Sequence, residues 1–352
     1  MQDASREEMP RVVFTRRRLL LSLVFVVSAV AFLYFVLPKI LGLQETWNRM
    51  QQGNVWWLAL GIVLEVLSFG CYVALFRAVL VRGTSRIDWR ESYQITMAGL
   101  AATRLFAAGG AGGIALTAWA LRRSGMEPRI VACRMIAFTA LLYGVYMVTL
   151  VIVGLGLYVG LFPGPAPFAI TVVPAAFGAV VIALFLAVSL LPGDFERLVA
   201  RWAGDQRFGR AARRLAAAPA SAATGIRMAL ALVRSRDPYL LGAIGWWGFD
   251  IAVLWACFHA FGDAPPQAVI VMSYFVGMLG NTLPLPGGIG GVDGGMIGAF
   301  TAFGVPVEIS VVSVLAYRAI AFWLPTIPGA VAYLQLRRTV QRWRAEQAPS
   351  YT

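Results

Sequence analysis

Six long apolar segments constrain the fold of this chain more than any other feature of its sequence. A run of about 20 apolar residues spans the hydrocarbon core of a bilayer, which is roughly 30 Å thick. The runs are continuous and do not alternate between apolar and polar residues, which argues against strands of a barrel. We therefore expect an all-α integral membrane protein whose spans cover residues 19–38, 55–81, 130–161, 168–191, 239–261 and 307–336.

Composition and charge support this class. Hydrophobic residues make up 59% of the 352 residues and charged residues 13%, about half the roughly 25% typical of soluble domains. The net charge of +13 comes from arginines at the ends of the apolar runs, which is the positive-inside pattern. We expect these arginines to face anionic lipid headgroups, and we expect no nucleic-acid partner.

Motifs for catalysis or for a cofactor are missing from the sequence. The sole lysine is Lys39, so the chain lacks the lysine of a P-loop. Each of the three cysteines stands alone in an apolar stretch, which predicts buried thiols and no metal site. The chain is therefore predicted not to be an enzyme and to bind no cofactor.

Two further segments are predicted to enter the membrane and return on the same side. Residues 92–121 have arginines on both flanks and the run GGAGG at 109–113 near their middle. Residues 267–304 contain no lysine or arginine and are broken by LPLPGGIGGVDGG. Pro284 and Pro286 in this break remove backbone donors and stop a helix. Both segments therefore read as re-entrant helical hairpins.

The order of these elements predicts an inverted repeat. Two spans, a broken hairpin and a third span occur in 19–161 and again, in the opposite orientation, in 162–337, within a single polytopic membrane domain, 1–352. Such repeats with discontinuous helices are typical of transporters, whose substrate site lies near the midplane. The N- and C-termini and the loop 192–238, which holds nine arginines, are expected on the cytoplasmic side. Amphipathic helices on the inner leaflet are possible within 194–236.

The two hairpin loops supply the first set of candidate binding residues. Non-helical backbone is tolerated at membrane depth only where protein buries it or water reaches it, which predicts a polar cavity. Helix N-termini at these loops suit an anionic headgroup. The alternative is that the glycines only allow a turn and close packing. The candidates are Gly109, Gly110, Gly112, Gly113, Pro286, Gly287, Gly288 and Gly290.

Charged residues within the predicted membrane region supply the second set. Each charge costs about 2.5–3.5 kcal/mol at a helix centre, so such residues usually pair or line a polar pathway. Our hypothesis is that Arg104 and Arg318 hold a lipid phosphate. Asp250 and Asp293 would then act as counter-charges or proton acceptors, with Glu65 as a possible additional member. A static buried salt bridge is the alternative.

Two motifs resemble a known family. LPLPGGIGGVDGG at 283–295 and YRAIAFWLPTIPG at 317–329 resemble the membrane domain of the lysylphosphatidylglycerol synthase/flippase family. Residues 99–126 look like the first re-entrant hairpin of that family. Asp293 stands where family members more often have glutamate. We expect no soluble aminoacyl-transfer domain like that of two-domain members, so the resemblance implies the flippase half without the synthase half.

The leading interpretation is a flippase that moves an anionic or phosphate-bearing lipid between leaflets of a bacterial cytoplasmic membrane. The first alternative is a non-transporting membrane subunit or scaffold that binds a lipid. An intramembrane enzyme acting on a headgroup ranks last, because no nucleophile or metal motif supports it. The expected partners are membrane lipids, and a homo-oligomer is left open.

Overall fold

The structure is a computed structural model that describes residues 53–83, 86–105, 111–191, 207–282 and 288–347. Its regular elements are all helical in these ranges. Five helical segments are long and apolar enough to cross a membrane, which confirms a multi-pass helical membrane protein. They are Val55–Val81, Pro128–Tyr158, Phe168–Ser189, Pro238–Phe261 and Val307–Trp343. They agree with five of the predicted spans, and the sixth, 19–38, lies outside the described residues.

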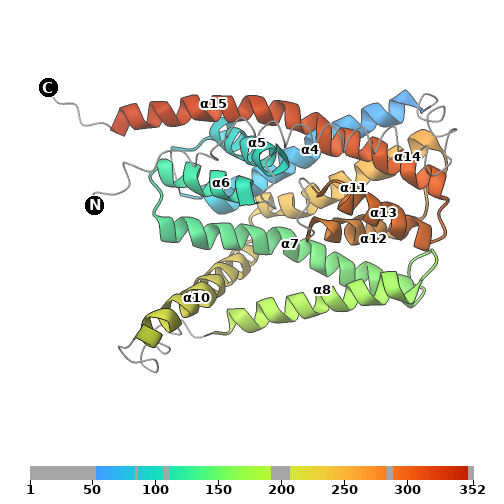
Figure 1. Cartoon of the computed structure of the whole chain (residues 1–352), viewed down its shortest axis with the longest axis horizontal. Coiled ribbons are helices and arrows are strands. Elements are labelled where there is room, and N and C mark those ends of the chain that lie inside the picture. Colours follow the sequence, from blue (N-terminus) through green and yellow to red (C-terminus); the bar gives the residue numbers. More distant parts are fainter. Residues whose placement is uncertain (1–52, 84–85, 106–110, 192–206, 283–287, 348–352) are drawn as a thin grey trace.

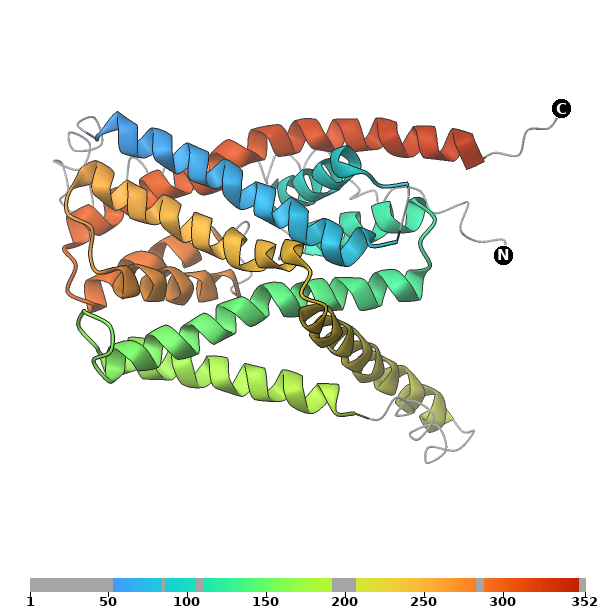
Figure 2. The ribbon, with the colours of Figure 1, turned by 180° about the vertical axis from the view of Figure 1, so that it is seen from behind.

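Helices α4 and α11 form the tightest pair in the bundle. Helix α4 (Val55–Phe76) continues into a π-helical turn, η2 (Arg77–Val81). Helix α11 (Gly242–Phe261) follows the 3-10 turn η3 (Pro238–Leu241) and lies along α4 (Figure 2). A Cβ at Gly242 would lie 2.3 Å from the backbone oxygen of Cys71. The absence of a side chain at this position therefore lets the two backbones approach.

Helices α7, α8 and α10 cover another side of the bundle. Helix α7 (Pro128–Tyr158) begins with a proline, which suits the first turn of a helix. It packs against α8 (Phe168–Ser189). Helix α10 (Arg207–Arg234) packs on α7 at one end and diverges from the bundle at the other (Figure 1). The predicted loop 192–238 therefore contains a helix, as expected, and its place at the inner leaflet stays a prediction.

Two pairs of shorter helices lie at opposite ends of the bundle (Figures 1 and 2). One pair is α5 (Trp89–Leu105) with α6 (Ala111–Arg123), and the other is α12 (Gln267–Met278) with α13 (Gly291–Ala302). The turn η4 (Leu279–Thr282) follows α12. Helices α6, α12 and α13 have 13, 12 and 12 residues. At 1.5 Å per residue they are roughly 18–20 Å long, too short to cross a bilayer alone.

The last long helix runs the length of the bundle with a π-helical turn inside it. Helix α14 (Val307–Arg318) leads into η6 (Ala319–Trp323), which leads into α15 (Leu324–Gln347). Two prolines, Pro325 and Pro328, follow the turn, and each leaves a carbonyl of the preceding turn without its usual donor. Single π-helical turns of this kind occur frequently at functional sites.

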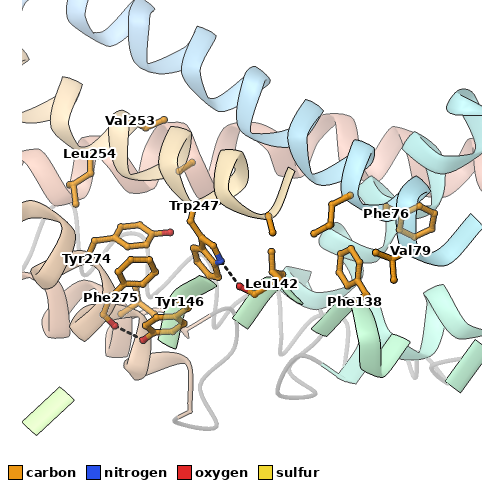
Figure 3. Close-up of a cluster of buried hydrophobic side chains, with 14 of the residues drawn as sticks. Phe76, Val79, Phe138, Leu142, Tyr146, Trp247, Val253, Leu254, Tyr274 and Phe275 are labelled. Atoms are coloured by element: carbon orange, nitrogen blue, oxygen red, sulfur yellow. Dashed lines mark hydrogen bonds between the residues drawn. The ribbon is translucent and has the colours of Figure 1, made fainter. Parts of the chain in front are cut away.

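An aromatic cluster joins α7, α11 and α12 (Figure 3). The rings of Tyr146 and Phe275 stack with centroids 4.5 Å apart. The Tyr146 hydroxyl donates to the backbone oxygen of Phe275, and the Trp247 indole donates to that of Leu142 over 2.8 Å. Buried aromatic residues with their polar atoms satisfied hold these three helices in fixed register.

Candidate functional site

All five charged residues that the sequence places within the membrane gather in one cluster, which we call the charge cluster: Glu65, Arg104, Asp250, Asp293 and Arg318. Four of them are buried, with exposed fractions of 3% for Glu65, 6% for Asp250, 1% for Asp293 and 7% for Arg318. Electrostatic interactions link Arg104 to Glu65, Asp250 and Arg318. Helices α4, α5, α11, α13 and α14 therefore each contribute one charge to the cluster.

Asp293 and Arg318 form a buried ion pair between α13 and α14. The Nε atom of Arg318 lies 2.6 Å from Oδ1 of Asp293. The other oxygen of Asp293 accepts from the backbone N–H of Gly290 over 2.8 Å, which caps the start of α13. The carboxylate thus occupies the positive end of its own helix. We expected a lipid headgroup at this helix start, and the structure places Asp293 there.

Arg104 is held by the backbone of the π-helical turn. Its Nη2 donates to the oxygen of Ala321 over 2.9 Å, and its Nη1 donates to the oxygen of Phe322 and to the Thr326 hydroxyl. The Ala321 oxygen is available because residue 325 is a proline and cannot donate to it. All three acceptors are neutral.

Phe322 lies against both arginines of the cluster. Its ring centroid is 4.6 Å from Cζ of Arg104 and 4.3 Å from Cζ of Arg318, within the range of cation–π attraction. Sequence reasoning did not select Phe322. Phe322 follows Arg318 by four residues, which places both on one helix face. This spacing was the sequence signal that could have identified Phe322 as a neighbour of Arg318.

Asp250 receives two tyrosine hydroxyls that sequence reasoning also missed. Its Oδ2 accepts from Tyr274 of α12 and, over 2.9 Å, from Tyr317 of α14. Its carboxyl group also interacts with that of Glu65 on the adjacent helix α4. Tyr317 precedes Arg318 in the second quoted motif, which also contains Phe322.

The candidate glycines divide by their surroundings. A Cβ at Gly113 would lie 2.5 Å from the backbone oxygen of Gly99, so this glycine lets α5 and α6 approach, in line with the packing alternative. Gly288 and Gly290 have φ values of 67° and 85°, which other residues rarely adopt. Gly112 lies beside Gly113 on α6. Four candidates lie outside the described residues: Gly109, Gly110, Pro286 and Gly287.

The cysteines and the sole histidine lie apart from the charge cluster. Cys133 and Cys257 are buried, as expected, while Cys71 is partly exposed. His259 donates from Nδ1 to the backbone oxygen of Trp255 over 3.1 Å, and its ring packs against Trp57 and Trp255. Within the described ranges, no group of three or more histidine, cysteine, aspartate or glutamate side chains is arranged to hold a metal ion.

Comparison with known proteins agrees with the resemblance seen in the motifs. A UPF0104 membrane protein of Methanothermobacter thermautotrophicus is 24% identical over 326 residues, which cover 88% of this chain and 94% of the relative. Another alignment to a UPF0104 membrane protein of that organism is 30% identical over 104 residues, 28% of this chain. A third relative, from Methanocaldococcus jannaschii, is 30% identical over 95 residues, 27% of this chain. The two shorter alignments span only 30% and 28% of the relatives' own lengths.

These relatives are archaeal, so the expected bacterial membrane stays a prediction. The family model described as the lysylphosphatidylglycerol synthase TM region matches residues 19–329, which include both quoted motifs and the whole charge cluster. This chain therefore belongs to the family of the lysylphosphatidylglycerol synthase transmembrane region.

Proposed function

We propose that this protein is a lipid flippase that moves an anionic or phosphate-bearing lipid between leaflets, past the charge cluster. The observation that carries the proposal is the environment of Arg104, an intramembrane guanidinium bonded to two backbone oxygens and a hydroxyl. A phosphate is a stronger acceptor for a guanidinium than a neutral carbonyl, because both partners are charged and the contact is bidentate. A passing headgroup would therefore replace Ala321 and Phe322 as the acceptors of Arg104.

The arrangement of the helix pairs supports a pathway of the transporter type. We propose that α5–α6 and α12–α13 are re-entrant hairpins. The two pairs lie at opposite ends of the bundle (Figure 1), and α6, α12 and α13 are too short to cross the bilayer. Arg104 stands at the last turn of α5 and Asp293 at the first turn of α13. Both belong to the connecting ends of their pairs, where a midplane site is expected.

The pairing of α4 with α11 supports an inverted repeat of 19–161 and 162–337. Each of these helices directly precedes one helix pair, and the two pack along each other. Equivalent elements of two repeats meet in this way at a pseudo-two-fold axis. Sequence and packing together favour this organisation of the single membrane domain.

We further propose a cytoplasmic-membrane location with both termini in the cytoplasm. The end of α4, the start of α5, the end of α6 and the start of α7 lie at one end of the bundle (Figures 1 and 2). Arginines flank each of these helix ends, for example Arg82, Arg90, Arg122 and Arg129. The positive-inside rule assigns such an end to the cytoplasm.

A lipid-binding scaffold without transport is the second candidate. The ion pair between Asp293 and Arg318 favours it, because both side chains are buried and a lasting pair would hold α13 against α14. The two functions differ in whether the cluster opens to a headgroup.

Reconstituted liposomes test the proposal directly. Fluorescent lipids with phosphatidylglycerol, phosphatidylethanolamine and phosphatidylcholine headgroups are added to one leaflet, and an outside quencher reports the fraction that crosses. We expect headgroup-dependent movement in the wild type and its loss in Arg104→Gln. The matched control is Arg90→Gln, an exposed arginine of the same helix. Failure of the folded wild type to move any lipid across a broad panel would favour the scaffold.

A further inference from the structure

We propose that Glu65 and Asp250 together bind a single proton, and that lipid translocation is coupled to its uptake. The coupling rests on the proposed flippase function, whereas the proton site stands on the geometry of α4 and α11.

The two carboxyl groups face each other across the tightest helix pair of the bundle. Glu65 is 3% exposed and Asp250 is 6% exposed, and their side chains interact directly. Two ionised carboxylates offer only acceptors and repel each other. A direct contact between them is favourable when one group carries a proton and donates it to the other, as in paired aspartates that share a proton.

Glu65 carries the oxygen atom of the pair that has no hydrogen-bond partner among the described residues. Asp250 Oδ2 already accepts from the hydroxyls of Tyr274 and Tyr317. The Oε2 atom of Glu65, in contrast, is buried without a hydrogen-bond partner among the described residues. A buried, ionised oxygen without a donor is unfavourable, and protonation of this carboxyl removes its negative charge.

The surrounding charges also favour one bound proton. Arg104 and Arg318 carry two positive charges, while Glu65, Asp250 and Asp293 carry three negative charges when ionised. One proton on the pair makes the charge cluster neutral, and a buried uncompensated charge is strongly unfavourable. Arg318 and the Gly290 N–H already occupy the two oxygens of Asp293.

Other titratable groups on the packed elements are engaged elsewhere. Arg77 of η2 donates to the backbone oxygen of Ile87 and to the Ser92 hydroxyl. Tyr146 of α7 donates to Phe275, and the turn η6 contains no titratable side chain. The groups that act directly on the pair are therefore Arg104, Tyr274 and Tyr317. Arg318 acts on Arg104 and on Tyr317.

Protonation of the pair gives a direct route to coupling. A proton from water adds to a carboxylate oxygen and removes one negative charge beside Arg104. The guanidinium then attracts an anionic headgroup more strongly, because less of its charge is compensated. Proton and lipid therefore bind together and move in the same direction. Release of the proton restores the carboxylate charge, which competes with the lipid phosphate for Arg104.

Infrared spectroscopy tests the proton site without any lipid transport. The purified protein, in a detergent without carbonyl groups, should show the C=O stretch of a protonated carboxyl at neutral pH. We expect this band to be lost in Glu65→Gln and in Asp250→Asn, and kept in Glu308→Gln, which replaces an exposed acid. Wild-type protein with 13C-labelled aspartate or glutamate side chains assigns the band by its isotope shift, even if a variant does not fold.

A pH gradient across the liposomes described above tests the coupling. We expect an anionic fluorescent lipid to accumulate on the side to which protons flow, and an ionophore that collapses the gradient to abolish this accumulation. A missing carboxyl band, or a band unchanged in both variants, overturns the proton site. Lipid movement that ignores the gradient overturns the coupling. A clear band without movement of any lipid supports the proton site and overturns the proposed flippase.

Discussion

The Nε atom of Arg318 lies 2.6 Å from Oδ1 of Asp293, and this ion pair links α14 to the first turn of α13. The side chains are 8% and 2% exposed, so each charge depends on the other for compensation. The same aspartate caps its helix through the Gly290 N–H. Loss of either member therefore leaves a buried charge and also loosens the start of a short helix.

Breaking this pair should destabilise the folded protein strongly. Removal of one partner from a buried ion pair typically costs about 3–5 kcal/mol. We expect Asp293→Asn and Arg318→Gln each to lower the midpoint of thermal unfolding in detergent, followed by tryptophan fluorescence. The double variant Asp293→Leu with Arg318→Met should recover much of the loss, because it leaves neither charge unpaired. Unchanged midpoints for both single variants would contradict the pair.

A glycine at the contact between α12 and α13 gives a second stability test. A Cβ at Gly277 would lie 2.8 Å from the backbone nitrogen of Met296, so Gly277→Ala must push the two helices apart. We expect a loss of about 1–3 kcal/mol, typical of overpacking. Gly298→Ala is the matched control on α13, since open space surrounds a Cβ there. It should be neutral or stabilise by about 0.5–1 kcal/mol. Equal effects of the two changes would argue against close packing at Gly277.

The sequence predicted the spans and the residues of the charge cluster, but it left open which of these residues pair. Apolar run length reports whether a helix crosses the membrane, so the five described spans were found within a few residues of their ends. A charged residue within an apolar run can also be recognised from the sequence. This is why the candidates included Glu65, Arg104, Asp250, Asp293 and Arg318. Pairing depends on contacts between distant segments, and no local pattern reports these.

The residues that were missed share a property. Tyr274, Tyr317 and Phe322 are aromatic residues in apolar helices, where most such residues only fill the core. Their roles arise from partners on other helices, namely Asp250 for the tyrosines and the two arginines for Phe322. The π-helical turn η6 was also unforeseen, although Pro325 signals a carbonyl without its donor.

Removal of one hydroxyl group, from the tyrosine that joins α7 to α12, should lower the stability of the protein. Tyr146 is buried, and its hydroxyl donates to the backbone oxygen of Phe275 (Figure 3). Tyr146→Phe leaves that oxygen unsatisfied inside the protein, which typically costs about 1–3 kcal/mol. The exposed neighbour supplies the control, because Tyr143 is 44% exposed and Tyr143→Phe should leave the unfolding midpoint unchanged. A similar shift for both variants would contradict the buried hydrogen bond as its cause, because the ring is kept in both and only the hydroxyl is lost.

The proposed topology makes the last prediction, which concerns the sides on which loops emerge. In a background without Cys71, Cys133 and Cys257, single cysteines are placed at two exposed positions, Glu127 between α6 and α7 and Asp263 between α11 and α12. A membrane-impermeant thiol reagent applied to intact cells should label the Asp263→Cys protein. The Glu127→Cys protein should react only after the membrane is opened, because an inverted repeat places the open ends of its two hairpins on opposite sides.

Two reference positions fix the sides in the same assay. Glu308→Cys lies at the start of α14, beside the open end of the second helix pair, and should behave like Asp263→Cys. Arg338→Cys lies in the last turns of α15, which extend past the other end of the bundle, and should behave like Glu127→Cys (Figure 1). Labelling of positions 127 and 263 from the same side would rule out the inverted repeat, because the open ends of the two helix pairs would then face the same side of the membrane.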